Sequence, residues 1–182
     1  MSRRTPPDEP RRKADHVQTI LDEILSFASM PWQVVLLRLA GALVLCGALG
    51  LERESRNRPA GLRTHMLVGL AAALYCLIML EVLDSADEYT DRVAMDPLRL
   101  IEAVTSGVAF LAAGMIIFNG GKVQGLTTGA SLWLAAAIGL GAGFGFWFMA
   151  VATTALALVV IRLVKLGEDK AHGRPRDDNP DA

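Results

Sequence analysis

Cysteine and histidine are scarce in this sequence, and the few that are present do not cluster. Cys46 and Cys76 are the two cysteines, and both lie inside apolar segments. Zinc sites need several Cys or His ligands at close spacing, and the sequence has no such spacing. We therefore expect no zinc centre, and we expect two unpaired thiols buried in helix contacts rather than a disulfide. The three histidines are spread along the chain, at His16, His65 and His172.

The sequence also lacks an excess of charge of either sign. Its formal net charge is -1, so it has no overall basic field of the kind that attracts nucleic acid. It contains no nucleophile–base pair, no phosphate-binding loop motif and no dinucleotide fingerprint. These absences predict a protein that is not an enzyme and does not bind nucleic acid.

Long apolar blocks dominate what is present, with 52% hydrophobic residues and a mean hydropathy of +0.37. A helix that spans a bilayer needs about 20 apolar residues. The last block, 127–163, is too long for one crossing and is interrupted near its middle by glycines, so it predicts two helices with a turn between them. We predict an all-α membrane protein, a bundle of five transmembrane helices with an N-terminal amphipathic helix. The five helices are expected at about 32–51, 62–83, 101–118, 127–141 and 145–165.

The segments outside this bundle are polar. Residues 1–15 are rich in proline and charge and lack the apolar core of a signal peptide. Apolar residues then recur at helical spacing over 16–30, which indicates an amphipathic helix on the membrane surface or against the bundle. The sequence thus predicts a disordered tail plus interfacial helix over 1–30, a transmembrane domain over 31–165 and a polar tail over 166–182.

The positions of lysine and arginine predict the orientation in the membrane. They are concentrated in the short segment 52–65 and after the last apolar block, and both lie on the same side if there are five spans. Short cytoplasmic loops carry an excess of these residues. We therefore expect the N-terminus outside and the C-terminus in the cytoplasm.

One charge, Arg38, interrupts the first apolar block. A charge near the centre of a spanning helix costs about 2.5–3.5 kcal/mol on insertion scales, so it usually faces protein or water. Three roles remain open: an anchor through a buried pair, a part of an ion pathway, or a side chain that snorkels to the interface. Glu102, near the start of the third block, is the best candidate partner.

Residues 52–65, ERESRNRPAGLRTH, form a segment that we call the Arg-rich loop. Its arginines stand beside Glu52 and Glu54. One interpretation is an anchor that contacts anionic lipid headgroups, at about 1 kcal/mol per cation near the surface. The other is a docking surface for an acidic partner or a phosphate-bearing ligand, using the fork of donors on each arginine.

Carboxylates collect in the segment 81–96, between the second and third helices. Mg²⁺ prefers oxygen ligands, so weak binding is chemically reasonable, but a solvated acidic loop is the better interpretation because the spacing matches no defined cage. The identity of any metal ligand is unknown, and no bound cofactor is expected. The weak metal candidates are Asp87, Asp96 and Glu102.

The segment 118–133 is rich in glycine and small polar residues. Gly125 and Gly129 have the spacing of a helix-contact motif, and Thr127, Thr128 and Ser131 can cap a helix or form hydrogen bonds across helices. Ordinary packing of the fourth helix is the simpler interpretation. Similar glycine spacings nearby make a homodimer reasonable.

Two long segments, 37–74 and 96–140, together with the last apolar helix, resemble the MgtC/SapB family of bacterial membrane proteins. The resemblance rests on LERE, then R-x-R-P-A-G-L-R-T-H, then G-L-T-T-x-A-x-L-W, in that order. The resemblance implies that the functional positions on these motifs are Arg38, Glu52, Arg53, Glu54, Arg63, Thr64, His65, Gly125, Thr127 and Thr128.

The resemblance implies an inner-membrane protein that supports adaptation to low Mg²⁺ and, in pathogens, survival inside host cells. It implies regulation of partner membrane proteins as the mode of action; the alternative is a transporter or channel for Mg²⁺ or another divalent cation. The expected partners are the lipid bilayer, other inner-membrane proteins and a second copy of the chain. We expect a short form without the cytoplasmic C-terminal domain of longer members.

Overall fold

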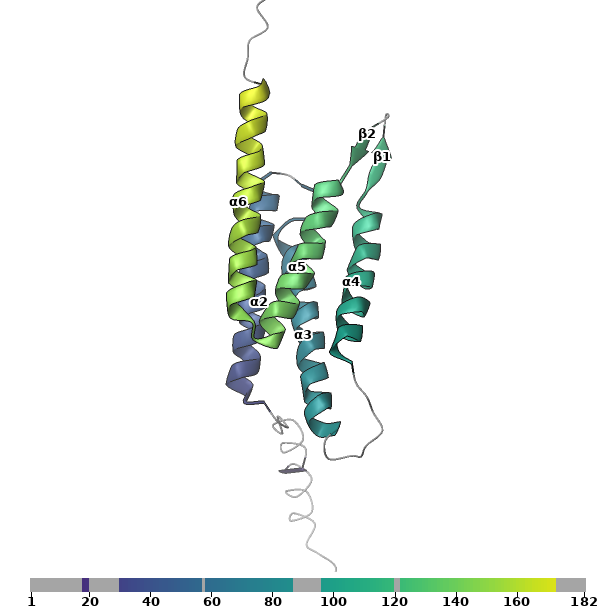
Figure 1. The fold of residues 1–182 in the computed structure, drawn as a ribbon, viewed down its shortest axis with the longest axis vertical. Helices are drawn as coiled ribbons and strands as arrows, with labels where there is room; N and C mark the ends of the chain where they lie inside the picture. Colours follow the sequence, from purple (N-terminus) through teal and green to yellow (C-terminus); the bar gives the residue numbers. More distant parts are fainter. Residues whose placement is uncertain (1–17, 20–29, 57, 87–95, 120–121, 173–182) are drawn as a thin grey trace, which may run out of the picture.

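The computed structural model describes residues 18–19, 30–56, 58–86, 96–119 and 122–172. The described part is almost wholly helical, which confirms the predicted all-α membrane fold (Figure 1). The predicted amphipathic helix over 16–30 lies almost entirely outside the described residues, as do both polar tails for most of their length. The elements are α2 (Trp32–Glu54), α3 (Leu62–Ala86), α4 (Pro97–Gly114), β1 (Ile117–Asn119), β2 (Lys122–Gln124), α5 (Leu126–Phe144) and α6 (Trp147–His172).

Four of these helices, α2 to α5, are long and apolar enough to cross a membrane. The apolar part of α6, Trp147–Leu163, is somewhat shorter. Successive helices run in opposite directions in Figure 1, so the chain crosses the length of the bundle repeatedly. The Arg-rich loop, the β1–β2 hairpin and the end of α6 lie at one end, which we call the Arg-rich end.

Helix α5 occupies the centre of the bundle and packs against α2, α3, α4 and α6. Small residues allow the close approach that this position requires. A Cβ atom at Gly139 of α5 would overlap the carbonyl oxygen of Gly69 on α3. A Cβ atom at Gly69 would overlap Sγ of Cys46 on α2, and this Sγ donates to the carbonyl oxygen of Ala135 at 3.3 Å. Cys46 and Cys76 are both buried free thiols, as predicted.

The predicted turn in the last apolar block is misplaced by a few residues. We expected it between 141 and 145, but α5 continues to Phe144 and the chain turns at Gly145, which has a φ of 80°. Gly139 and Gly143 stay helical because they face α3: a Cβ atom at Gly143 would lie 2.8 Å from Cβ of Cys76. These glycines serve helix contact, and one glycine after them supplies the left-handed conformation of the turn.

The third helix differs more from its predicted range of 101–118. It starts earlier because Asp96 caps it, with Oδ1 accepting the N–H of Leu98 at 2.9 Å, and because Pro97 suits the first helical position. It ends at Gly114, and the chain then forms the antiparallel hairpin of β1 and β2. This hairpin was not predicted.

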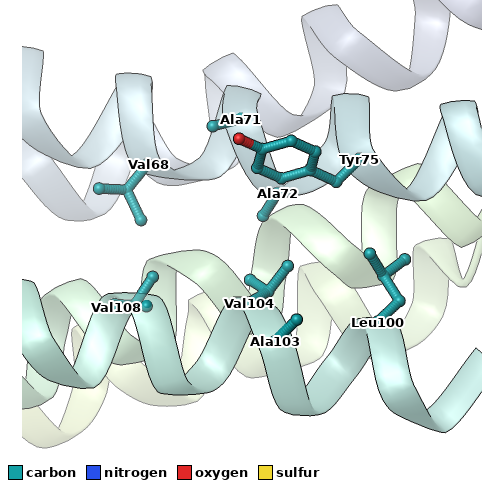
Figure 2. A pocket seen from close by; sticks show the side chains of 9 residues that line it. Val68, Ala71, Ala72, Tyr75, Leu100, Ala103, Val104 and Val108 are labelled. Carbon is teal, nitrogen blue, oxygen red and sulfur yellow. The ribbon is translucent and has the colours of Figure 1, made fainter.

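Helix α4 is attached to the bundle along one side. Only 6% of its spanning window is buried, against 61% for α5. Between α3 and α4 lies a groove of about 420 Å³, shown in Figure 2. The side chains that line it are apolar except for Tyr75, and the others are Val68, Ala71, Ala72, Leu100, Ala103, Val104 and Val108, with Gly107 completing the wall.

Candidate functional site at the Arg-rich end

The Arg-rich loop is a short, well-braced connection between α2 and α3. The carboxylate of Glu54 accepts the N–H of Leu62 at 2.8 Å and so caps the start of α3. The Ser55 hydroxyl donates to the carbonyl oxygen of Glu52 at 2.7 Å. The carbonyl oxygen of Arg53 accepts the backbone N–H groups of Arg56 and Arg58 at 3.2 and 3.3 Å. Hydrogen bonds from both sides therefore hold the backbone that carries the arginines.

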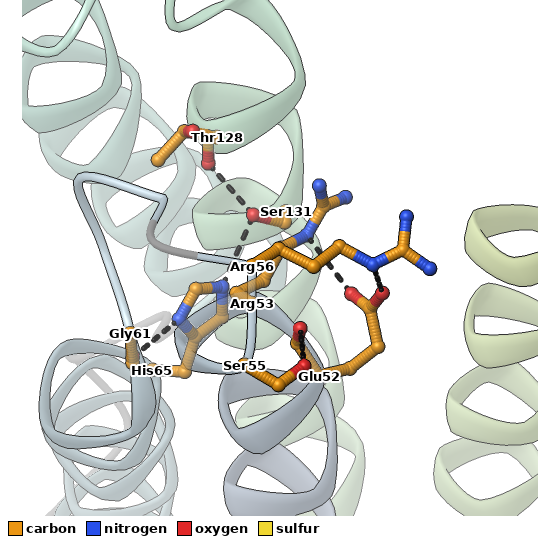
Figure 3. Close-up of polar contacts among 8 residues, drawn as sticks. All are labelled: Glu52, Arg53, Ser55, Arg56, Gly61, His65, Thr128 and Ser131. Carbon is orange, nitrogen blue, oxygen red and sulfur yellow. Dashed lines mark hydrogen bonds and ion pairs between the residues drawn. The ribbon is translucent and has the colours of Figure 1, made fainter. Parts of the chain in front are cut away.

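Glu52 is the centre of an ion cluster with Arg53 and Arg56 (Figure 3). One carboxylate oxygen lies 3.7 Å from Nε of Arg53, and the other contacts Nε of Arg56. The side chains of Glu52 and Arg53 are 8% and 5% exposed, and that of Arg56 is 22% exposed. No hydrogen bond reaches either Glu52 oxygen from the described residues, so opposite charge alone stabilises this buried carboxylate.

His65 connects the loop to the central helix. Its imidazole is fully buried, with Nδ1 at 2.8 Å from the carbonyl oxygen of Gly61 and Nε2 at 3.1 Å from Oγ of Ser131 on α5. Oγ of Ser131 in turn lies 2.8 Å from the carbonyl oxygen of Thr128, a second acceptor within reach of its proton. Figure 3 shows these contacts as one continuous hydrogen-bond network from the Arg-rich loop to α5.

The two ends of this hydrogen-bond network are the carbonyl oxygens of Gly61 and Thr128, which only accept hydrogen bonds. A neutral His65 therefore places its proton on Nδ1, toward Gly61, and leaves Nε2 as an acceptor. The Ser131 hydroxyl has one proton, which it can give to Nε2 or to the carbonyl oxygen of Thr128. The network joins α3 to α5 in a region where no other polar partner for His65 is present among the described residues.

Arg38 lies at the opposite end of the bundle, and the structure contradicts its predicted pairing with Glu102. Its Nη1 donates to the carbonyl oxygen of Gly143 at 2.8 Å. A cation is favourable there because the last carbonyl groups of a helix carry partial negative charge. Glu102 is exposed on α4.

The remaining predicted residues are placed as follows. Arg63 and Thr127 are exposed, Thr64 is half-buried and Thr128 is buried. Gly125 precedes α5 with a φ of 87°, and a Cβ atom there would overlap the carbonyl oxygen of Met115. Of the weak metal candidates, Asp96 caps α4 and Asp87 lies outside the described residues.

The structure thus gathers the residues of the Arg-rich loop and Thr128 at one end, and it leaves Arg38, Asp96 and Glu102 elsewhere. No group of three or more His, Cys, Asp or Glu side chains that could hold a metal ion occurs in the part of the chain that is described. Arg56 and Ser131 complete the site although neither was among the predicted site residues. We named Ser131 as a residue that can cap a helix or form a hydrogen bond across helices, but nothing in the sequence pattern identified His65 as its partner.

These features define a multi-pass membrane protein with a cluster of polar side chains at one end of a tightly packed helical core. The profile of the MgtC family matches residues 39–169, and the chain belongs to that family. No solved structure matches the chain.

Curated relatives agree with this assignment. The chain is 42% identical over 105 residues to the putative magnesium transporter YhiD of Escherichia coli (strain K12), covering 57% of this chain and 48% of the relative. It is 43% identical over 101 residues to protein MgtC of Brucella abortus (strain 2308), covering 56% and 39%. It is 37% identical over 106 residues to protein SapB of Bacillus subtilis (strain 168), covering 58% and 45%. The matched region spans less than half the length of each of these relatives.

Proposed function

We propose that this chain is an inner-membrane protein that supports adaptation to low Mg²⁺ by acting on partner membrane proteins. In this proposal it does not conduct the ion itself and it is not an enzyme. Its N-terminus lies outside and its Arg-rich end faces the cytoplasm. The name of one relative, the putative magnesium transporter YhiD, supports the link to magnesium, and the packing of the core supports the regulatory mode.

The observation that carries the proposal is the character of α5. This central helix contains no ionisable residue, and it contacts α3 so closely at Gly139 and Gly69 that no side chain fits between them. Mg²⁺ is strongly hydrated and needs oxygen ligands to replace its water. The middle of the described bundle offers small apolar residues instead, and the groove between α3 and α4 is apolar as well (Figure 2).

The alternative is a transporter or channel for Mg²⁺ or another divalent cation. The relative named putative magnesium transporter YhiD favours it. A single copy of this bundle would need ligands that its core does not supply. In this alternative a second copy of the chain would therefore contribute to the pathway, for which the exposed side of α4 is available.

Mg²⁺ flux into liposomes that carry the purified full chain separates the two functions. We expect no saturable flux, and we expect the Glu102→Gln variant to behave like the original chain. Saturable flux that Glu102→Gln abolishes would show that the chain conducts the ion and would overturn the regulatory proposal.

Growth at low Mg²⁺ tests the regulatory proposal directly, in cells that depend on this chain. We expect Arg53→Ala combined with Arg56→Ala to remove growth at low Mg²⁺ while the protein level is unchanged, because these arginines form the candidate site. Arg58→Ala combined with Arg162→Ala is the control, since it removes the same charge from exposed positions. Equal growth defects in both double variants would show that charge alone matters and would contradict the proposal.

A further inference from the structure

The charges in the ion cluster of the Arg-rich loop do not balance. Glu52 contributes −1, while Arg53 and Arg56 contribute +1 each, so the cluster carries a net charge of +1. Glu52 and Arg53 have less than a tenth of their side-chain surface exposed. An unbalanced charge in such a place is unfavourable unless a further counter-charge joins it. The cluster is therefore suited to accept one more anion.

The donors that an anion would use are unoccupied. Each arginine directs its Nε toward Glu52, and its terminal Nη groups make no hydrogen bond to another described residue. Figure 3 shows both guanidinium ends extending from Glu52 toward the same side. Two guanidinium forks that face one region match the oxygens of a phosphate group, which accept several hydrogen bonds at once.

The position of the cluster indicates where the phosphate comes from. Helix α2 is apolar from Leu39 to Leu51, and Leu51 is 57% exposed on the outside of the bundle and so suits contact with lipid. Glu52 and Arg53 follow directly, at the point where the apolar stretch ends. This is the level at which phospholipid headgroups meet the protein, and juxtamembrane arginines are attracted there by anionic lipid.

We propose that Arg53 and Arg56, held in place by Glu52, bind the phosphate of an anionic phospholipid headgroup. This inference deepens the proposed function by naming the ligand of the Arg-rich loop. Its test measures lipid binding rather than flux or growth, so each proposal can fail without the other.

A built site and simple charge attraction differ in the effect of removing Glu52. If the arginines only attract anionic lipid through their charge, Glu52→Gln makes the loop more positive and strengthens binding. If Glu52 orients the two forks, the same change releases them and weakens binding in spite of the added positive charge. The sign of the effect therefore separates a site from a basic patch.

The measurement is native mass spectrometry of the full chain in detergent, titrated with phosphatidylglycerol. We expect one lipid molecule to bind more tightly than the rest. We expect Glu52→Gln to lower the affinity for that lipid about tenfold, because the hydrogen bonds from both guanidinium forks lose their alignment. Glu168→Gln is the matched control, since it makes the same change of charge on α6 near the same end. Binding by Glu52→Gln that equals or exceeds that of the control would overturn the proposal.

A second, conservative variant tests the proposal if Glu52→Gln prevents the protein from folding. Arg56→Lys keeps the charge at a partly exposed position but loses the planar fork, and we expect about threefold weaker binding of the same lipid. Arg58→Lys is its control. Unchanged affinity in Arg56→Lys, or displacement of the lipid by millimolar inorganic phosphate, would contradict a site built for the phosphate of a lipid.

Discussion

Buried polar side chains in this bundle are stabilised in two different ways. Hydroxyl groups of Thr154 and Ser131 lie 2.8 Å from carbonyl oxygens one turn earlier in their own helices, and His65 connects to Ser131 across the contact between α3 and α5. Glu52, by contrast, is held by the opposite charges of two arginines. The hydrogen-bonded groups belong to the packing of the bundle, whereas the charged cluster remains open to a further ligand.

The contact between Ser131 and His65 should contribute measurably to stability. We expect Ser131→Ala to lower the free energy of unfolding by about 0.5–2 kcal/mol, because Nε2 of His65 loses its partner in a buried place. Thermal denaturation of the purified chain in detergent measures the change.

The matched control is Ser106→Ala on α4, where the serine is exposed. The midpoint temperature of thermal denaturation of this variant should stay close to that of the original chain. A Ser131→Ala variant that is as stable as the control would show that the contact with His65 contributes nothing.

Most polar residues of the Arg-rich end were predictable from the sequence, but Arg56, Ser131 and the partners of the predicted residues were not. The density of arginine and glutamate indicated that the Arg-rich loop is a candidate site. Arg38 was a candidate because it is a charge inside an apolar block. Partners depend on which helix faces which, and that follows from packing rather than from local pattern. Arg38 shows the difference: a carboxylate was the obvious partner, yet the carbonyl oxygen of Gly143 lies closer because the end of α5 packs beside the start of α2.

The glycines of α5 and α4 differ in how closely neighbouring atoms approach them. Gly139 and Gly143 of α5 meet the backbone or Cβ atoms of α3 at distances that exclude any side chain. Gly107 and Gly114 of α4 have nothing within 4 Å of the place where a Cβ atom would lie. The same residue type thus permits close packing in one helix and leaves open surface on the other.

A single methyl group should therefore have opposite effects in the two helices. We expect Gly139→Ala to destabilise the bundle by about 3 kcal/mol, because the methyl group overlaps the backbone of Gly69, which cannot move without separating α3 from α5. We expect Gly107→Ala to stabilise it by about 0.5–1 kcal/mol through the lower backbone entropy of the unfolded chain.

Unfolding in detergent, followed by circular dichroism, compares the two variants. Folded yield by size-exclusion chromatography provides a second reading if Gly139→Ala does not accumulate. Similar stability of the two variants would mean that the close contact between α3 and α5 does not form.

The long apolar blocks made the helices themselves predictable, since α2 and α3 begin where the sequence indicated. The residues at which the helices end were less predictable. The hairpin was missed because Ile116 to Phe118 continues the apolar character of the third helix, and apolar character alone does not separate a short strand from a helix. Asn119 followed by Gly120 and Gly121 between apolar residues is a hairpin signal that could have identified it.

For the molecule as a whole, the alternating helices place the Arg-rich loop and the end of α6 together. The exposed end of α3, near Asp84, lies at the other end. If short basic loops face the cytoplasm, then all of the polar site described above faces it as well. This orientation follows from charge, and labelling from one side of the membrane tests it.

We expect a cysteine at Arg58 to resist a membrane-impermeant maleimide in intact spheroplasts and to react after lysis. A cysteine at Asp84 should react in both conditions. Cys46 and Cys76 are buried, so the original chain provides a low background. Labelling of Arg58→Cys in intact spheroplasts, without labelling of Asp84→Cys, would reverse the orientation.

The central place of α5 has a consequence for the biogenesis of the protein. The helix is the most buried of the four spans, yet its mean hydropathy is 1.3, well below the 2.3 of α2 and α3. A weakly hydrophobic helix gains little from lipid alone. In chain order it follows α2, α3 and α4, so three of the four helices that it contacts are synthesised before it. We therefore expect neighbours already in the membrane to stabilise its insertion, and deletion of α3 should impair the integration of α5 although α5 itself is unchanged.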